Sequence, residues 1–217
     1  MTDYAAARTI MVDSQVRPSD VTRYPIIEAM LAVPREEFVP AALKPVAYAG
    51  AHVPLSGNRV VLDPRVFSKI IDALEVGPRD LVLDVGCGLG YSTAVISRLA
   101  EAVIAVEEIP EMAAEAAETL AAQGADNAVV TEGPLAGGDP SHGPYDVIVL
   151  EGGVEQLPEA LPAQLKDGGR IAMIHIEGTA GRARIGFKTG GRIAWRYIFD
   201  ATAPVLEGFE ATPGFKF

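Results

Sequence analysis

Short apolar runs alternate with helical patterns from residue 81 towards the end of the chain. The runs that predict β-strands cover residues 81–85, 102–106, 128–130, 147–150 and 170–174. Between the second and third runs, Met112, Ala116 and Leu120 recur at helical spacing. Strands that alternate with helices form parallel sheets whose two faces are both covered. We therefore predict an α/β fold with a doubly wound, mostly parallel sheet.

A β-hairpin is predicted after these strands. Residues 183–187 and 192–199 are apolar enough to form strands, and they flank the turn signal Thr189-Gly190-Gly191. Two strands joined by so short a turn must be antiparallel. The hairpin brings the predicted sheet to seven strands.

The N-terminal part of the chain has a different pattern. It is mostly helical, Pro34 ends one of its helices, and residues 49–64 read as an extended segment. We expect a single domain over residues 1–217, in which residues 1–75 form an N-terminal cap and acceptor-side segment on a core of residues 76–217.

A glycine-rich turn follows the first predicted strand and carries the main chemical signal. It reads Asp84-x-Gly86-x-Gly88-x-Gly90, and the glycines let the backbone lie close to a ligand. A dinucleotide-binding turn reads G-x-G-x-x-G and receives a pyrophosphate, which a leading carboxylate would repel. A carboxylate accepts hydrogen bonds from an ammonium or hydroxyl group. The turn therefore indicates a Rossmann-like methyltransferase site for the amino acid half of S-adenosylmethionine (SAM).

Four acidic residues are predicted at the carboxyl ends of neighbouring strands. Asp84 belongs to the glycine turn, Glu107 follows the second strand, and Glu132 and Glu151 follow the third and fourth. Glu107 lies roughly 20 residues beyond the glycines, where an acid binds ribose hydroxyls. Because ligands of such sheets bind at this edge, we expect the four carboxylates to line one rim.

The start of the predicted first helix adds smaller signals. Tyr91 and Ser92 open that helix, where a hydroxyl caps amide groups or, for Ser92, contacts the SAM carboxylate. Cys87 is the single cysteine, so no intramolecular disulfide is possible, and we interpret it as a small apolar residue of the cofactor loop.

Charge and composition narrow the class of partner. A net charge of −11 disfavours binding to nucleic acid phosphates. No apolar run is long enough to span a membrane, and the first residues lack a basic region followed by an apolar stretch, so we expect a cytoplasmic protein. His52, His142 and His175 show no metal-ligand spacing, and we expect no metal site.

The chain resembles the protein-L-isoaspartate O-methyltransferase family over nearly its whole length. The segment Val33-Pro34-Arg35-Glu36-Glu37-Phe38-Val39-Pro40 is more diagnostic than the glycine turn, which many methyltransferases share. The other matching stretches are 29–32, 47–48, 81–91, 106–109, 144–149 and 162–170. The resemblance implies a SAM-dependent repair enzyme that esterifies the carboxylate of isoaspartyl residues in proteins or peptides and releases S-adenosylhomocysteine (SAH).

The resemblance also implies roles for individual residues. Residues 84–90 correspond to the loop around the methionine part of SAM, and Glu107, with Glu108 beside it, to the ribose ligand. Glu132-Gly133 stands where the family usually has Asp-Gly near the adenine.

The acceptor side departs from the family pattern. Where the family has Gly-Gln-Thr-Ile-Ser-x-Pro, this chain has residues 58–64, so Val60 and Leu62 replace the threonine and the acceptor-site serine. Glu151 replaces the threonine of the usual Thr-Ala-Ala. An ionised Glu151 would repel a carboxylate acceptor. Arg59 would offset this only if it turned inward, and we expect it to be solvated.

Three hypotheses follow from these departures. The first is carboxyl methylation of isoaspartyl residues. The second is a methyltransferase of the same scaffold with a hydroxyl, amine or small-metabolite acceptor and Glu151 as its base. The third is a non-catalytic SAM-binding protein. The sequence indicates no oligomeric state.

Overall fold

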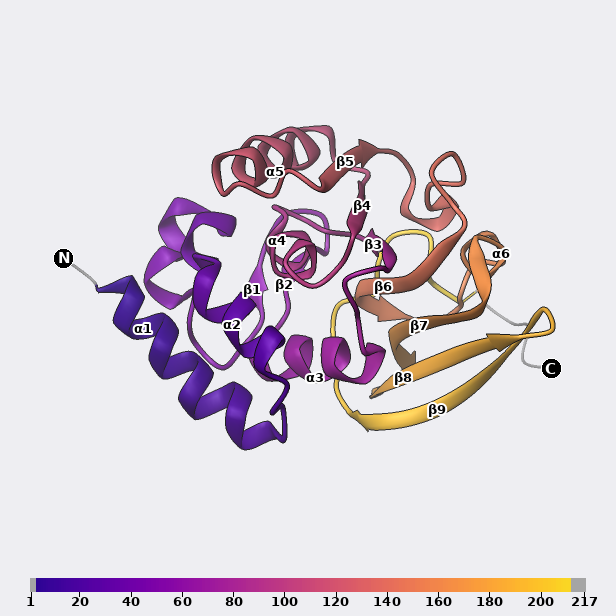
Figure 1. The fold of residues 1–217 in the computed structure, drawn as a ribbon, viewed down its shortest axis with the longest axis horizontal. Helices are drawn as coiled ribbons and strands as arrows, with labels where there is room; N and C mark the ends of the chain where they lie inside the picture. The colour runs from indigo at the N-terminus through magenta and orange to yellow at the C-terminus, as the bar shows by residue number, and fades with distance from the viewer. Residues whose placement is uncertain (1–2, 212–217) are drawn as a thin grey trace.

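The computed structural model of the protein describes residues 3–211 and has a seven-stranded sheet at its centre (Figure 1). Its strand order is β5-β4-β3-β6-β7-β8-β9. The strands are β3 (Leu81–Val85), β4 (Ala102–Glu107), β5 (Ala128–Glu132), β6 (Tyr145–Val154), β7 (Leu165–Glu177), β8 (Ala180–Thr189) and β9 (Arg192–Asp200). A separate two-stranded antiparallel sheet comprises β1 (Val53–Pro54) and β2 (Val60–Val61).

Helices precede, connect and follow these strands. The α-helices are α1 (Tyr4–Met11), α2 (Tyr24–Ala32), α3 (Pro64–Leu74), α4 (Tyr91–Ser97), α5 (Pro110–Ala122) and α6 (Ala160–Ala163). Short π or 3-10 turns are η1 (Val12–Val16), η2 (Arg17–Ser19), η3 (Arg35–Phe38), η4 (Ala41–Val46) and η5 (Leu135–Gly137). The predicted helix that ends before Pro34 is α2, and the predicted helix after the second strand is α5.

β3 is the central parallel strand that the glycine turn follows. It pairs in parallel with β4 on one side and with β6 on the other. Val82 packs into the core on one face of the sheet and Leu83 into the core on the opposite face. Both side chains are fully buried, as expected for a strand covered on both faces.

The predicted C-terminal hairpin is confirmed. β8 and β9 are antiparallel, and the two turn residues Gly190 and Gly191 have φ values of 58° and 75°, as a tight two-residue turn requires. β7 is longer than the predicted strand of residues 170–174. It extends to Glu177 because it pairs along its far half with β8, where Glu177 is opposite Ala180.

The two faces of the sheet have different covers. One core cluster contains side chains of the cap, α3, α4 and α5 together with one face of the sheet. The other is smaller and is closed by η5, α6 and the segment that holds Leu206 and Phe209. In Figure 1 the cap and α5 lie to the left and above, and α6 lies at the right. This arrangement is the predicted doubly wound α/β fold.

Arg35 ties the cap to the rest of the molecule. Its guanidinium is fully buried, and it donates to the carbonyl oxygens of Ala47 (2.6 Å) and Leu62 (2.7 Å). It also lies 4.7 Å from the ring centroid of Tyr91 at the start of α4. One side chain therefore fixes η3, the acceptor-side segment and α4 relative to one another.

We expect Arg35→Met to destabilise the fold by about 2–4 kcal/mol, because it leaves buried carbonyl groups without their charged donor. Urea unfolding measures this loss. Arg17→Met is the matched control, since Arg17 pairs with Asp13 on the surface. Equal stability of the two variants would contradict the anchoring role of Arg35.

Candidate functional site

The glycine turn joins β3 to α4 through left-handed backbone. Gly86, Gly88 and Gly90 have φ values of 79°, 59° and 95°, which side-chain-bearing residues rarely adopt. The amide of Gly86 donates to the carbonyl of Val106 (2.9 Å), so the turn folds back onto the end of β4. Gly90 is the N-cap of α4.

Three of the four predicted acids gather beside this turn. Asp84 is in register with Ala105 of β4 and Val149 of β6, and Glu107 and Glu151 lie two residues further along these strands. Side chains two residues apart share a face of the sheet. All three are buried, with exposures of 0%, 0% and 4%. Glu107 is the last residue of β4 and Glu151 lies within β6, so neither follows its strand as predicted.

The fourth acid, Glu132, lies at the same rim but is not buried. It is the last residue of the edge strand β5, opposite Glu107 of β4, and its side chain is exposed. The four acids therefore follow one end of neighbouring strands, as predicted, and Glu132 alone is open to solvent. The backbone amide of neighbouring Gly133 donates to the carbonyl of Glu107 (3.1 Å).

Asp84 is held by hydroxyl groups of α4. Its Oδ2 atom accepts hydrogen bonds from Ser92 Oγ (2.7 Å) and Thr93 Oγ1 (2.6 Å), while its buried Oδ1 atom has no partner. Burial raises the pKa of Asp84 to about 6. Ser92 and Thr93 thus bind the strand acid and do not cap α4, contrary to expectation, and Thr93 was not predicted as a site residue.

The surroundings of Glu151 disfavour its charged form. Burial raises the pKa of its carboxyl group well above the ordinary value, and the negative charge of Asp84 raises it further. Its Oε1 atom is buried and has no hydrogen-bond partner. The protonated form that these surroundings favour would not repel a carboxylate acceptor.

Glu107 is fully engaged by the chain itself. Arg59 Nε lies 3.2 Å from each carboxylate oxygen of Glu107, and the backbone amides of Gly88, Glu108 and Ile109 donate to the same group at 2.9–3.1 Å. Arg59 is 1% exposed, so the expectation that it is solvated is wrong. Its Nη1 atom donates to the carbonyl of Gly57, and its Nη2 atom lies 3.8 Å from Glu108.

The space directly above Gly88 is also filled. A Cβ atom added to Gly88 would lie 2.6 Å from Leu55 Cδ1 and 3.5 Å from Met112 Cε. Leu206 covers Gly86 and Gly152 in the same way on the opposite side of the sheet edge. The close approach that the glycines permit is thus made here by apolar side chains of this chain.

The remaining predicted site residues, Leu62, Tyr91 and Cys87, are buried and make packing contacts. Leu62 is 2% exposed and packs in the larger core cluster. Tyr91 lies against Phe38 and Phe67, at centroid distances of 6.0 and 5.7 Å. Cys87 is buried, and burial raises the pKa of its thiol.

The hydrogen-bonding groups of the site suit SAM at its methionine end and conflict with it at its ribose end. At the methionine end, left-handed glycines and two unpartnered buried carboxyl oxygens suit a cationic amino acid group. At the ribose end, Glu107 has no acceptor capacity left while Arg59 holds it, and Leu55 lies over the turn. The nucleoside can enter only if these two side chains move.

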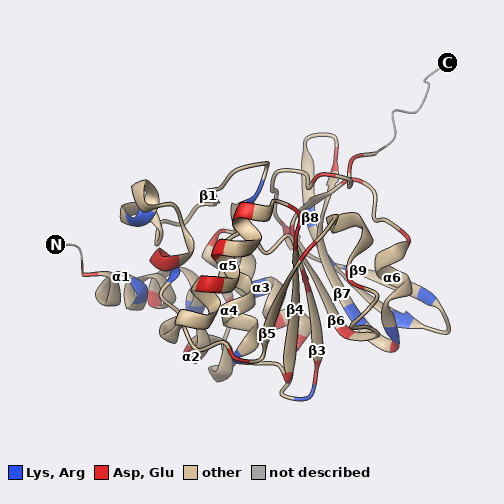
Figure 2. Cartoon of the chain, turned by 90° about the horizontal axis from the view of Figure 1, so that it is seen from above, with Lys and Arg blue, Asp and Glu red and all other residues tan. Residues whose placement is uncertain are grey.

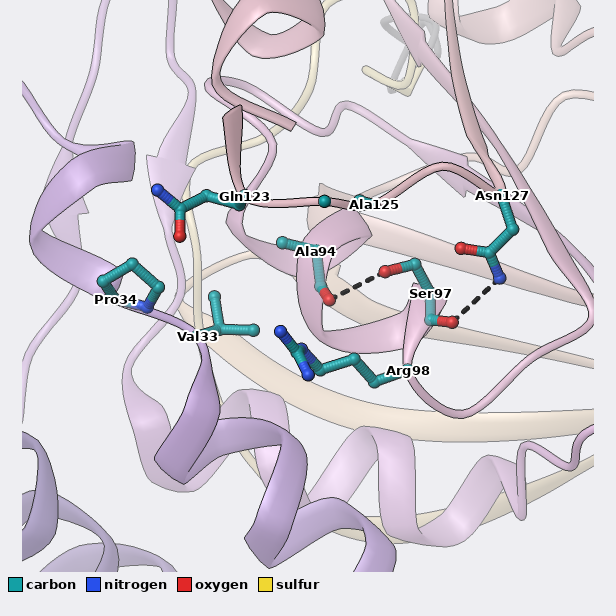
Figure 3. Close-up of a pocket in the computed structure, with 9 residues that line it drawn as sticks. Val33, Pro34, Ala94, Ser97, Arg98, Gln123, Ala125 and Asn127 are labelled. Atoms are coloured by element: carbon teal, nitrogen blue, oxygen red, sulfur yellow. Dashed lines mark hydrogen bonds between the residues drawn. The ribbon is translucent and has the colours of Figure 1, made fainter. Parts of the chain in front are cut away.

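A separate small cavity of about 100 Å³ lies at the opposite end of α4 (Figure 3). It is lined by Val33, Ser97, Arg98 and the residues after α5, among which Asn127 donates to the carbonyl of Ser97 at 2.9 Å. Its lining contains no carboxylate and none of the predicted site residues, so it is not part of the candidate site.

Comparison with known proteins identifies a family for this chain. The sequence matches the family described as Protein-L-isoaspartate(D-aspartate) O-methyltransferase over residues 9–185. Protein-L-isoaspartate O-methyltransferase 1 of Polaromonas sp. is 37% identical over 77% of this chain and 71% of its own length. The enzyme of Ignicoccus hospitalis is 38% identical over 72% of this chain and 75% of its own length.

Solved structures agree on the fold. A Plasmodium falciparum protein described as a protein-L-isoaspartate O-methyltransferase in complex with SAH superposes with a TM-score of 0.79 at 18% identity, covering 95% of this chain and 99% of its own. A second protein-L-isoaspartate O-methyltransferase gives 0.78 at 24% identity, and this chain spans 65% of it.

The sheet, the glycine turn and the buried acids define a Rossmann-like methyltransferase of the class that uses SAM. Within that class, the chain belongs to the protein-L-isoaspartate O-methyltransferase family. The resemblance inferred from its sequence is confirmed.

We expect Asp84→Asn to change how stability depends on pH. The pKa of Asp84 is raised on folding from 3.8 to about 6, so its contribution is fully present below about pH 4 and is lost as the pH rises through 6. The variant has no charge to bury, and one amide oxygen can accept both hydroxyl hydrogen bonds. Its stability relative to wild type should therefore grow by up to about 3 kcal/mol between pH 4 and pH 7.

Urea unfolding at several pH values measures this difference. Asp13→Asn is the control, because Asp13 is an exposed partner of Arg17. A parallel pH dependence in wild type and Asp84→Asn would refute the assignment of the raised pKa to Asp84.

Proposed function

We propose that this chain transfers the methyl group of SAM to the carboxylate of isoaspartyl residues in proteins or peptides, releasing SAH. The proposal is supported by family membership and by the carboxyl groups beside the glycine turn. When bound, SAM supplies a methyl group on a positively charged sulfur, and its transfer to a carboxylate oxygen requires no proton transfer.

The residues of the chain would act by binding, alignment and exclusion of water. The unpartnered oxygen of Asp84 would receive the amino group of the donor, and Glu107, once released by Arg59, its ribose hydroxyls. Ser92 and Thr93 hold Asp84 in orientation from α4. The apolar cover from Leu206 excludes water from the far side of the strand ends.

The burial of Glu151 with an unpartnered carboxyl oxygen supports a carboxylate acceptor, because burial favours the protonated form of Glu151. A protonated carboxyl group does not repel an anion, and it can donate a hydrogen bond to it. It thereby offers a donor where the family has a threonine hydroxyl. As a protonated acid, Glu151 is also poorly suited to act as a base for a hydroxyl or amine acceptor.

One observation favours the alternative with a changed acceptor. Both hydroxyl residues of the family's acceptor segment are absent, and the side chain of Leu62 in their place is buried in the core. A hydroxyl, amine or small-metabolite acceptor, or a SAM-binding protein without catalysis, would explain that loss.

The proposed partner is a protein or peptide and not a nucleic acid. Glu111, Glu115 and Glu118 lie on the exposed face of α5, which is marked by red bands in Figure 2, and such a surface repels phosphate. No helix within residues 3–211 combines the length and apolar character that crossing a membrane requires. We propose a cytoplasmic location, where SAM and ageing proteins are both present.

Methyl-labelled SAM with an isoaspartyl peptide tests the proposed function. We expect label in a base-labile methyl ester with the isoaspartyl peptide and none with the matching aspartyl peptide. A panel of hydroxyl and amine acceptors serves as the comparison. Labelling of one of these in place of the isoaspartyl peptide would establish the alternative.

The Glu151→Gln variant distinguishes between two roles of Glu151, hydrogen-bond donor and general base. An amide is neutral and donates at every pH, so we expect activity within about threefold of wild type, maintained at alkaline pH where the wild type declines as Glu151 ionises. Glu151→Ala should lose about 10–100-fold, because it has no donor. A loss of about 100-fold or more in Glu151→Gln would instead identify Glu151 as a base.

A further inference from the structure

The loop of residues 55–59, at the tip of the β1–β2 hairpin, lies over the glycine turn. Leu55 covers Gly88, as described above, and Ser56 Oγ lies 3.1 Å from Met112 Sδ of α5. A Cβ atom on Gly57 would lie 2.5 Å from Ile109 Cδ1. This 55–59 loop therefore packs against Gly88, Ile109 and Met112, next to the carboxylate of Glu107 that Arg59 holds.

Arg59 occupies the hydrogen-bonding capacity of Glu107. A carboxylate offers about four lone-pair sites. The two oxygens of Glu107 already receive Arg59 Nε and three backbone amides, and the Arg59 contact is shared between both oxygens. The three amides belong to the turn and to the end of β4. Arg59 is the only one of these donors on a separate segment, and it alone can leave without unfolding the sheet edge.

The ion pair is also incompletely satisfied. Both side chains are fully buried, yet Arg59 Nη2 has no hydrogen-bond partner and lies 3.8 Å from Glu108. A buried guanidinium with unused donors gains less from its site than one with all its donors paired. The contact is therefore suited to exchange with a ligand that also satisfies Glu107.

The base and the tip of the hairpin are held by different contacts. His52 Nε2 lies 2.8 Å from the carbonyl oxygen of Thr202, and His52 Nδ1 accepts a hydrogen bond from the amide of Asp63 at 2.9 Å. Arg35 holds the carbonyl of Leu62. The tip is held by Arg59 and by apolar contacts, so the 55–59 loop can move without loss of the anchors at its two ends.

We propose that Arg59 and Leu55 are internal competitors of the methyl donor and set its affinity. The inference rests on the proposed function for the identity of the donor. Donor binding requires Arg59 to release Glu107 and Leu55 to leave Gly88. The apparent affinity is then the intrinsic affinity reduced by the fraction of molecules in which the loop has opened.

Calorimetry with SAH tests this competition. We expect Arg59→Gln to bind SAH about tenfold more tightly than wild type and Leu55→Ala to bind it several-fold more tightly. Arg59→Gln leaves the buried Glu107 without its positive partner, and this could destabilise the fold. Leu55→Ala changes no charge, so it tests the same inference without that effect. Thermal unfolding without ligand verifies that each variant is folded.

Two cap variants serve as matched controls. Arg17→Gln removes an exposed arginine, and Leu43→Ala removes a half-buried leucine of η4. Both should bind SAH as wild type does. A gain in either control equal to that of the loop variants would overturn the inference, because the gain would then reflect general loosening of the cap.

The outcomes separate this inference from the proposed function. If wild type binds SAH and methylates the isoaspartyl peptide while folded Arg59→Gln and Leu55→Ala gain no affinity, the competition is wrong and the function stands. If both variants gain affinity and no form methylates the peptide, the competition stands and the proposed acceptor is wrong. If no form binds SAH, both are wrong.

Discussion

The burial of carboxyl groups at one edge of the sheet is the constraint on which the site depends. Asp84, Glu107 and Glu151 lie on three neighbouring parallel strands, on one face, and are shielded from water. Each is stabilised differently. Asp84 receives two hydroxyl groups, Glu107 receives an arginine and three amides, and burial favours the protonated form of Glu151. The backbone of the glycine turn contributes the amide of Gly88 to Glu107.

The cap is therefore a part of the site and not an accessory to it. The arginine that neutralises Glu107 comes from the β1–β2 hairpin, and the base of that hairpin is held by Arg35 from η3. Arg35 in turn lies over Tyr91 at the start of α4, the helix whose hydroxyls bind Asp84. Cap packing and carboxylate placement are linked through a few buried polar side chains.

The sequence predicted the sheet well because its signals are local. Apolar runs, the glycine turn and the Gly190-Gly191 hairpin each act within a few residues. The extent of β7 was missed, since it depends on pairing with β8. The same distinction applies to the site. The acid positions were predicted from strand ends, but the partner of Glu107 lies 48 residues away, and nothing near Arg59 indicates that it turns inward.

Three other features of the site depend on the fold and not on local sequence signals. Glu132 ends its strand opposite Glu107, as predicted, but β5 is an edge strand and leaves its side chain exposed. Thr93 follows Ser92 on the first turn of α4, and only the fold of the glycine turn brings both hydroxyls to Asp84. The ionisation of Glu151 depends on burial, which a residue's position in the sequence does not fix.

The charges of the site explain why the acceptor segment carries an arginine. A buried Glu107 needs a positive partner or enough donors, and Arg59 meets that need from the segment in which the family has uncharged residues. A sulfonium donor is itself cationic and brings ribose hydroxyls to the same carboxylate. Glu107 already accepts from Arg59 and three amides, so the ribose that we propose as its ligand would have to take the place of Arg59.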